Sequence, residues 1–204
     1  MTIRTSNGIF KWGTYLCGAF LCIVLFTRCA GPDINAHKQR LPELDLFTFF
    51  QGKTVAFGIF EDRFGQMRRQ FRVEIDGTIS KDMLQLDERF LYDDGETDRR
   101  IWHITKQTKG SGMTSFTGQA EDVAGTASGQ LSGNTFRWRY DIDLVLSGNE
   151  MRVHFDDFIY QIDKDIAINR AYVSKWGIEI GSVTLIFLKQ ELAQSLIPLD
   201  LKNW

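Results

Sequence analysis

The chain has 204 residues, with 43% hydrophobic and 25% charged residues, which is typical of one globular domain preceded by a short targeting segment. The net charge is −2, and the first 28 residues contain basic but no acidic side chains, so the remainder is acidic. An acidic domain has no electrostatic reason to bind nucleic acid, whose affinity comes mainly from phosphate neutralisation. The three cysteines are Cys17, Cys22 and Cys29, and none follows them in the sequence. The later domain therefore cannot contain a disulfide or a zinc site built on thiolates.

Residues 1–28 are predicted to be a signal peptide. They combine a basic start with an apolar run over residues 13–26, which is shorter than the ~20 residues that comfortably span a bilayer. Cys29 follows this run, which predicts lipoprotein processing with acylation of that cysteine. Arg28 stands where a small residue is usual, so an uncleaved membrane anchor remains the alternative.

Either outcome tethers the chain to a membrane. Ala30 follows Cys29, whereas lipoproteins retained in the inner membrane typically have Asp there, so the sequence predicts the periplasmic face of the outer membrane. Residues 29–45 are predicted to be the lipidated cysteine and a polar tether, in which Pro32 and Pro42 interrupt regular structure. Residues 46–204 are predicted to form the domain.

The domain sequence consists of short segments of alternating hydrophobicity, separated by turns that contain Gly, Asn or Asp. This pattern predicts an all-β fold, a single antiparallel meander of about nine or ten strands that closes into a lipocalin- or calycin-like barrel. Closure removes exposed edges, and a β-sandwich is the alternative. Short helices are predicted near residues 44–50 and 191–196. The strands are predicted at residues 54–62, 66–75, 83–92, 99–108, 115–123, 126–131, 135–146, 151–162, 166–174 and 178–191.

Charged side chains are predicted on the inner face, because alternate residues of a strand share a face. An unpaired buried charge is costly, so these groups should pair with each other or meet water or a ligand. A structural ion pair such as Arg69 with Glu88 is therefore an alternative to ligand binding. A bulge at Asp156–Asp157 that turns Phe158 inward is also possible. The inward charges are Arg69, Glu88, Asp122, Asp157 and Arg170.

Aromatic and small residues complete the predicted interior. Tyr92, Trp102, Trp138 and Tyr140 are predicted to form walls. Small residues alternate at Gly118 and Ala120 and again at Ala127 and Gly129, which would leave interior volume for an apolar ligand. These positions could equally serve bends at barrel corners.

No motif for metal or cofactor binding is present. The three histidines have no metal-ligand spacing, and no nucleophile elbow, phosphate loop or dinucleotide fingerprint occurs, so we expect neither a metal nor a cofactor. The carboxylates Glu88, Asp122 and Asp157 leave general acid–base chemistry on a lipid or glycan open.

Several spaced patterns resemble an uncharacterised family of Gram-negative lipoproteins, known as domain of unknown function 3833, from about Cys29 to Lys189. The resemblance implies a lipoprotein, and some members are encoded near enzymes that modify membrane fatty acids, such as cyclopropane-fatty-acid synthase. The barrel is also loosely similar to lipocalins, which have a Gly near the first strand and a Trp two residues later; here Gly52 is present, but Thr54 stands in place of the Trp. The patterns are Ala56-x-Gly58-x-Phe60-x-Asp62-Arg63-x-Gly65, Arg69-x-Phe71, Glu88-x-Phe90-x-Tyr92-x-Asp94-Gly95-Glu96, Arg100-x-Trp102, Gly118-x-Ala120-x-Asp122-Val123, Trp138-x-Tyr140, Asp156-Asp157 and Asn169-Arg170-Ala171.

The sequence thus favours a membrane-anchored binding barrel for an apolar or amphipathic molecule, a fatty acid or lipid, in which Arg69 or Arg170 meets the head group. The partners expected are the membrane, through acylated Cys29 or an uncleaved anchor, and the lipid. A structural or adaptor lipoprotein with a filled barrel is one alternative, and an enzyme that modifies lipids or glycans is the other.

Overall fold

The structure is a computed structural model that describes residues 32–108, 114–146 and 149–201. The chain divides into two compact units, Met1–Asp33 and Ile34–Trp204, and every described helix and strand lies in the second. Cys29, the predicted lipidation site, lies outside the described residues. Within the described ranges, no helix has both the length and the apolar character needed to cross a membrane.

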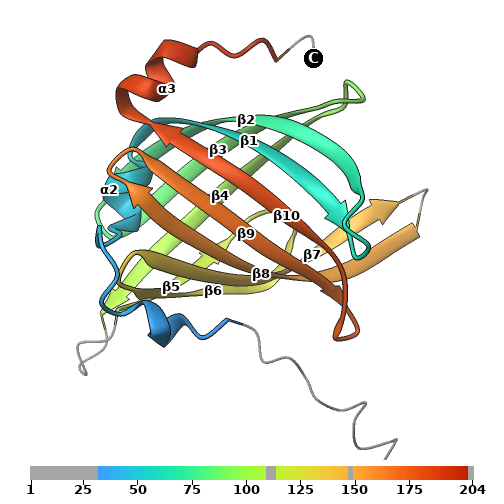
Figure 1. Ribbon diagram of the computed structural model, residues 1–204, viewed down its shortest axis with the longest axis horizontal. Helices are drawn as coiled ribbons and strands as arrows, with labels where there is room; N and C mark the ends of the chain where they lie inside the picture. Colours follow the sequence, from blue (N-terminus) through green and yellow to red (C-terminus); the bar gives the residue numbers. More distant parts are fainter. Residues whose placement is uncertain (1–31, 109–113, 147–148, 202–204) are drawn as a thin grey trace, which may run out of the picture. The chain divides into compact units, whose positions relative to one another are not determined.

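In the described residues, ten antiparallel strands form a closed barrel, which confirms the predicted meander barrel and excludes the sandwich (Figure 1). Each strand pairs with its sequence neighbours, and closure comes from pairing of the first strand with the last. The strands are β1 (Gly52–Asp62), β2 (Met67–Ser80), β3 (Met83–Tyr92), β4 (Thr97–Thr108), β5 (Thr114–Gln119), β6 (Val123–Ser132), β7 (Thr135–Leu146), β8 (Asn149–Asp163), β9 (Ile166–Lys175) and β10 (Ile178–Lys189).

Two turns that the strand limits predicted, at residues 76–77 and 124–125, do not form there, because Gly77 and Gly125 lie inside strands. Gly77 lies inside β2, and a Cβ at this position would come within 1.7 Å of the Phe50 carbonyl oxygen, so this Gly admits a close approach of another backbone. Gly125, with φ +78°, lies within β6, where the pairing register with β7 shifts. The predicted turns at residues 76–77 and 124–125 are therefore wrong.

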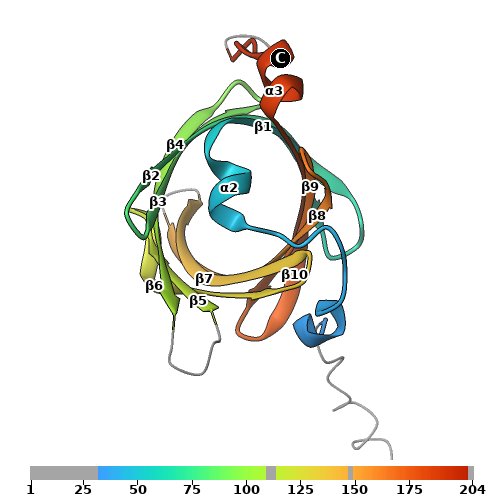
Figure 2. The ribbon, with the colours of Figure 1, turned by 90° about the vertical axis from the view of Figure 1, so that its left-hand side faces the viewer.

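A short helix, α2 (Leu46–Phe50), lies across one end of the barrel (Figure 2). Asp45 caps it, because its Oδ1 accepts hydrogen bonds from the backbone N–H groups of Phe47 and Thr48 at 3.0 and 3.1 Å. Lys189 Nζ donates to the Thr48 carbonyl at 2.7 Å, and Phe50 meets Phe187 edge-on with ring centroids 5.2 Å apart. The sequence places an apolar plug at this end.

The segment before α2 also packs on the barrel. It contains a 3₁₀ turn, η1 (Ile34–His37), and both Ile34 and Leu44 are buried. The Leu44 N–H donates to the Gly133 carbonyl at 3.0 Å, between the ends of β6 and β7. The described part of the predicted tether thus differs from a free linker, because two apolar residues hold it on the barrel.

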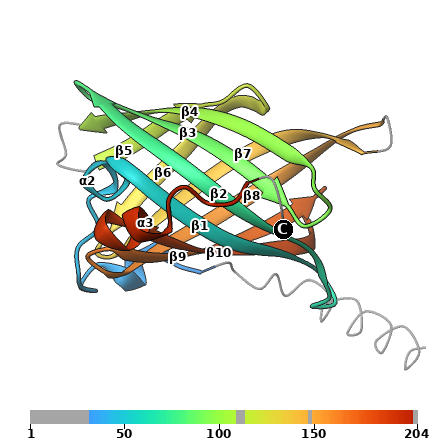
Figure 3. The same ribbon diagram turned by 90° about the horizontal axis from the view of Figure 1, so that it is seen from above.

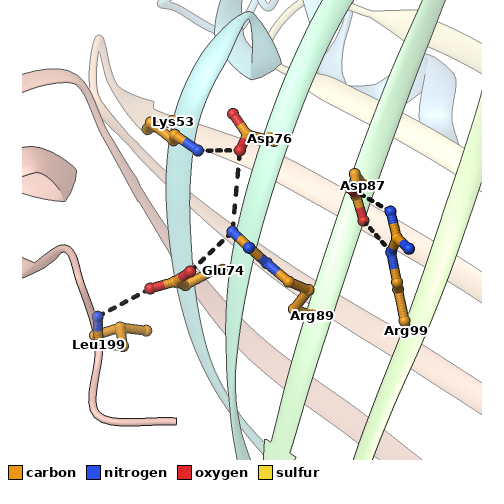
Figure 4. A network of polar contacts seen from close by, with 7 residues as sticks. All are labelled: Lys53, Glu74, Asp76, Asp87, Arg89, Arg99 and Leu199. Carbon is orange, nitrogen blue, oxygen red and sulfur yellow. Dashed lines mark hydrogen bonds and ion pairs between the residues drawn. The ribbon is translucent and has the colours of Figure 1, made fainter.

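The C-terminal segment lies on the outside of the barrel. It begins with α3 (Gln190–Leu196) and then runs over the outer face of β1 and β2 (Figure 3). The Leu199 N–H donates to Glu74 Oε1 at 2.9 Å, and Glu74 Oε2 accepts from Arg89 at the same distance. This network of polar side chains on the outer face continues through Lys53 and Asp76 (Figure 4).

The small residues of β5 and β6 do not open interior volume, contrary to one prediction. A Cβ at Gly118 would lie 2.6 Å from the Trp138 ring, and one at Gly129 would lie 2.6 Å from Phe136 and 2.7 Å from Trp138. Aromatic rings of β7 therefore occupy the space that these glycines provide. The glycines position the aromatic wall, and the cavity lies on the other side of it.

Candidate ligand-binding cavity

The barrel encloses a cavity of about 510 Å³, within the range of small-molecule sites, about 300–1,000 Å³. Leu46 and Phe50 of α2 contribute to its lining at one end, while Arg68, Leu144 and Met151 line it toward the other. None of the described helices crosses that second end (Figure 1). We therefore take the second end, referred to below as the open end, as the candidate entrance of the cavity.

A second hollow, of about 680 Å³, lies on the outer surface beside the C-terminal segment. Leu196 and Leu199 form one side of it, and residues of β1, β2, β9 and β10 form its floor. It contains none of the predicted ligand-binding residues, the carboxyl groups of Glu88 and Asp157 included. The interior cavity is therefore the candidate functional site.

Packed aromatic side chains form one wall of the cavity. The Trp102 ring lies edge-on to Trp138, with centroids 5.5 Å apart, and edge-on to Tyr140 at 5.2 Å. Phe155 stacks on Tyr140 at 5.2 Å. The three predicted wall residues Trp102, Trp138 and Tyr140 thus line the cavity together, as does Tyr92 closer to the open end.

A carboxyl group lies against this wall. Asp157 is only 7% exposed, and its Oδ2 accepts a hydrogen bond from the Tyr140 hydroxyl at 3.2 Å. Burial raises the pKa of Asp157 to about 7, although Tyr140, Asn169 and the charge of Arg100 oppose the shift. The predicted bulge at Asp156–Asp157 is absent, so the inward phase of β8 continues from Asp157 to Ile159.

Two buried acceptor atoms in this part of the cavity have no hydrogen-bond partner among the described residues. They are Oδ1 of Asp157 and Oδ1 of Asn169, and Asn169 is only 4% exposed. The residues lie on adjacent strands, since Asp157 pairs with Ala171 and Ile159 with Asn169. A buried acceptor without a donor is unfavourable by about 1–3 kcal/mol. The cavity wall therefore carries unsatisfied polar groups.

Glu88 is the second inward carboxyl group. It lines the cavity from β3 and lies opposite Arg100 of β4 in the strand ladder. Burial raises its pKa to about 7; the Arg100 charge opposes this shift, while Asp122 and Asp157 add to it. Glu88 and Asp157 can therefore change protonation near neutral pH.

Arg100 is held by Asp122. The Arg100 guanidinium donates to both Asp122 carboxylate oxygens, with its shortest contact at 2.6 Å. Asp122 was predicted as a ligand-binding side chain, but it lies in the β5–β6 turn and does not line the cavity. It acts on the cavity by holding Arg100 and by adding to the raised pKa of Glu88.

Arg69 reaches the open end of the cavity rather than its middle. It binds Asp94 at 2.9 Å and also Glu96, both in the β3–β4 turn, and its guanidinium carbon lies 3.6 Å from the Tyr92 ring centroid. The proposed ion pair between Arg69 and Glu88 does not form. The acidic residues of the β3–β4 turn take the place of Glu88 as partners because Arg69 lies near the start of β2, next to that turn.

Arg170 points outward, so its predicted inward position is wrong. It donates to Thr184 Oγ1 at 2.8 Å and contacts Glu61 at 3.4 Å, and its side chain is 40% exposed. The inner face of β9 consists of small and polar residues, whereas Ile168 lies outside. The prediction had assigned the face that carries the larger apolar residue Ile168 to the interior, and this assignment of β9 was wrong. Ala167, Asn169, Ala171 and Val173 are the buried residues.

Sequence reasoning missed Arg100 and Asn169. Arg100 stands two residues before the inward Trp102, so strand alternation could have found it. Asn169 carried no such signal, because the β9 alternation was assigned to the opposite face. In the described part of the chain, no group of three or more His, Cys, Asp and Glu residues is placed to bind a metal ion.

Comparison with known proteins agrees with the fold. A family model described as "Protein of unknown function (DUF3833)" matches residues 23–189. The chain belongs to this family. No curated protein matches it. Among solved structures, an S-type phycobiliprotein lyase CpeS from Guillardia theta is similar, with a TM-score of 0.56 and 9% identity over 78% of this chain and 99% of that chain. At 9% identity, the similarity between this chain and the lyase concerns the fold alone.

Proposed function

We propose that this protein is a membrane-anchored carrier that holds one amphipathic lipid inside its barrel. The observation that supports this most directly is the cavity of about 510 Å³ with apolar walls and a polar cluster. A ligand site of this kind typically combines many apolar contacts with a few placed polar groups. A barrel filled by its own side chains would have no such volume, which counts against the structural or adaptor alternative.

The open end of the barrel suits an apolar ligand. Trp176 in the β9–β10 turn is 90% exposed, and Phe64 in the β1–β2 turn is 75% exposed. The two turns belong to neighbouring hairpins, because β1 pairs with both β2 and β10. Large exposed apolar side chains next to a cavity entrance are suited to receiving an apolar molecule.

Native mass spectrometry of the protein purified from its host tests the proposal. We expect a bound mass in the range of a single lipid, released on unfolding. A ligand-free spectrum, together with no thermal shift across a panel of lipids and fatty acids, would contradict it.

A pair of matched variants locates the ligand. Ala171 lines the cavity, whereas Ala124 pairs with Asp141 on the outer face of the barrel. Ala171→Leu fills part of the cavity and should abolish the bound lipid mass, while Ala124→Leu should retain it. Equal lipid retention in both variants would place the ligand outside the barrel.

The anchor is the second part of the proposal. The apolar run before Cys29 supports acylation of that cysteine, with the domain at the periplasmic face of the outer membrane. We expect the protein to incorporate an alkyne-labelled fatty acid, and expect Cys29→Ala to lose the label. Label retained in Cys29→Ala would refute acylation at this residue, and fractionation of the two membranes tests the location.

Catalysis on the bound lipid is a second candidate function, which one observation favours. Glu88 and Asp157 line the same cavity, and burial brings the pKa of each to about 7, where a carboxyl group can act as an acid or a base. Mass spectrometry of the bound lipid before and after incubation tests this. A change in lipid mass that Glu88→Gln or Asp157→Asn prevents would favour the enzyme over the carrier.

A further inference from the structure

The polar groups of the cavity specify the chemistry of the ligand's head group, an inference that rests on the proposed function. Asp157 Oδ1 and Asn169 Oδ1 face the cavity from adjacent strands, and neither atom accepts a hydrogen bond of normal geometry among the described residues, although the Asn169 side chain is near enough to lower the pKa of Asp157. Both side chains are more than nine-tenths buried, so bulk water does not solvate them freely. The unmet requirement at this place is therefore a donor.

The cationic groups around the cavity bind acids, although Arg69 Nε is buried without a hydrogen-bond partner among the described residues. Arg100 binds Asp122 at 2.6 Å, and Arg68 binds Asp62 at 2.6 Å. Arg69 binds Asp94 and Glu96 in the turn at the open end. In the middle of the cavity, an anionic head group would have to displace Asp122 before it could bind Arg100.

An anionic head group would also meet like charge. Glu88 and Asp157 both line the cavity, and the charge of Asp157 already disfavours ionisation of Glu88. The Tyr140 hydroxyl, a neutral donor in the wall, is already engaged with Asp157 Oδ2 at 3.2 Å. Around Asp157 and Asn169 the cavity therefore offers acceptors and carboxyl groups, whereas the unpartnered Nε of Arg69 lies toward the other end.

We infer that the ligand is an amphiphile whose polar group donates hydrogen bonds, a hydroxyl or an amine, to Asp157 and Asn169, and that a free carboxylate is disfavoured beside these two residues. Apolar residues line the end of the cavity at α2, among them Leu46 and Phe50 of α2 and Phe187 of β10. They accommodate the apolar chain of such a molecule. The inference differs from the expectation that a fatty-acid carboxylate meets Arg170, which lies outside the cavity lining.

Competition among three ligands of equal chain length tests the inference. The full-length protein, freed of endogenous lipid and held in amphipol, is loaded with the fluorescent probe 1-N-phenylnaphthylamine, which dodecan-1-ol, dodecylamine or dodecanoate then displaces. We expect the alcohol or the amine to bind about tenfold more tightly than dodecanoate, the ratio expected for one hydrogen bond to a charged group. The comparison of alcohol with amine distinguishes the two donors.

Matched variants on adjacent residues assign the effect. Asp157→Asn replaces an acceptor oxygen by an amide nitrogen and should remove the preference for donors. Asp156→Asn makes the same change on the outer face, where Asp156 binds Arg137 at 2.6 Å, and should leave the preference unchanged. Circular dichroism checks folding, and Asn169→Leu serves as the second variant if Asp157→Asn does not fold.

The outcomes separate the inference from the proposed function. If neither the probe nor any of the three ligands binds, the lipid-carrier proposal fails. If dodecanoate binds as tightly as the alcohol and the amine, the carrier stands and the inference is overturned. A donor preference that survives in both Asp157→Asn and Asn169→Leu would also overturn it, because the preference would then arise elsewhere.

Discussion

The outer and inner faces of the barrel differ in how their charged side chains are paired. On the outer face, Arg137 binds Asp156 through two contacts of 2.7 and 2.6 Å, and Arg152 binds Asp143 in the same manner. On the inner face, Asp157 keeps one oxygen without a donor among the described residues. Outer charges pair with their neighbours, whereas inner acceptors remain open.

The difference indicates that outer and inner charged residues have different roles. Outer pairs link adjacent strands and help to fix their register, as with Asp143 opposite Arg152 in the β7–β8 ladder. Inner carboxyl groups do not by themselves stabilise the barrel, since burial disfavours their charged forms and raises their pKa. Groups that destabilise the folded protein are expected where a ligand completes their contacts.

The largest expected effect is on stability at high pH. The pKa of Asp157 is raised from 3.8 to about 7 on folding, so the folded state retains the proton and stability falls as pH rises from about 4 to about 7. Asp157→Asn removes this loss, and we expect a gain on the order of 3 kcal/mol at pH 8 and little change at pH 4. Urea denaturation at both pH values measures it.

The control for this prediction is Asp156→Asn, which should not stabilise the protein at pH 8 because it breaks the pair with Arg137. Glu88, whose pKa is also raised to about 7, should maintain a weaker pH dependence in Asp157→Asn. Equal gains for Asp157→Asn at pH 4 and pH 8 would contradict a buried ionisable group as the cause.

The next effect concerns the apolar part of the inner face. A Cβ at Gly129 would lie 2.6 Å from Phe136 and 2.7 Å from Trp138, so Gly129→Ala forces these rings to move. We expect a loss of about 1–3 kcal/mol, as for other overpacked cores, and an altered Trp fluorescence spectrum. Ser128→Ala, at the exposed neighbouring position, is the control and should leave both unchanged.

A smaller effect is expected at the partly buried outer pair. Arg137 and Asp156 have side chains that are 22% and 19% exposed, so water screens them only in part. A double-mutant cycle with Arg137→Gln and Asp156→Asn should give a coupling energy of about 1 kcal/mol by urea denaturation. A coupling near zero would place this pair with the solvated charges of the surface.

The smallest effect is expected at the most exposed outer pair. Arg152 is 61% exposed and Asp143 is 35% exposed, although their two hydrogen bonds are 2.6 and 2.7 Å long. The same cycle here should give at most about 0.5 kcal/mol, falling as salt is added. If this coupling exceeds that of Arg137 with Asp156, burial does not govern the outer charges.

Strand alternation predicted much of the inner face correctly. β7 contains apolar residues at every second position from Phe136 to Leu146, and its other face has no apolar residue before Val145, so only one phase is possible. β9 has Ile168 on the outside and Ala167 and Ala171 on the inside, so side-chain size pointed to the wrong face. Alternation fails where the buried residues are the smaller ones, because the packing partner on the neighbouring strands then sets the phase.

The sequence by itself determined the strand number, most strand limits, the short plug helix and the inward direction of Glu88 and Asp157, because period-two alternation and turn residues act over a few neighbours. Only the tertiary structure decided which charges meet. Arg100 binds Asp122, Arg69 binds the β3–β4 turn, and Asp157 and Asn169 keep open acceptors. Such pairing depends on distances between strands after closure, which no local pattern encodes.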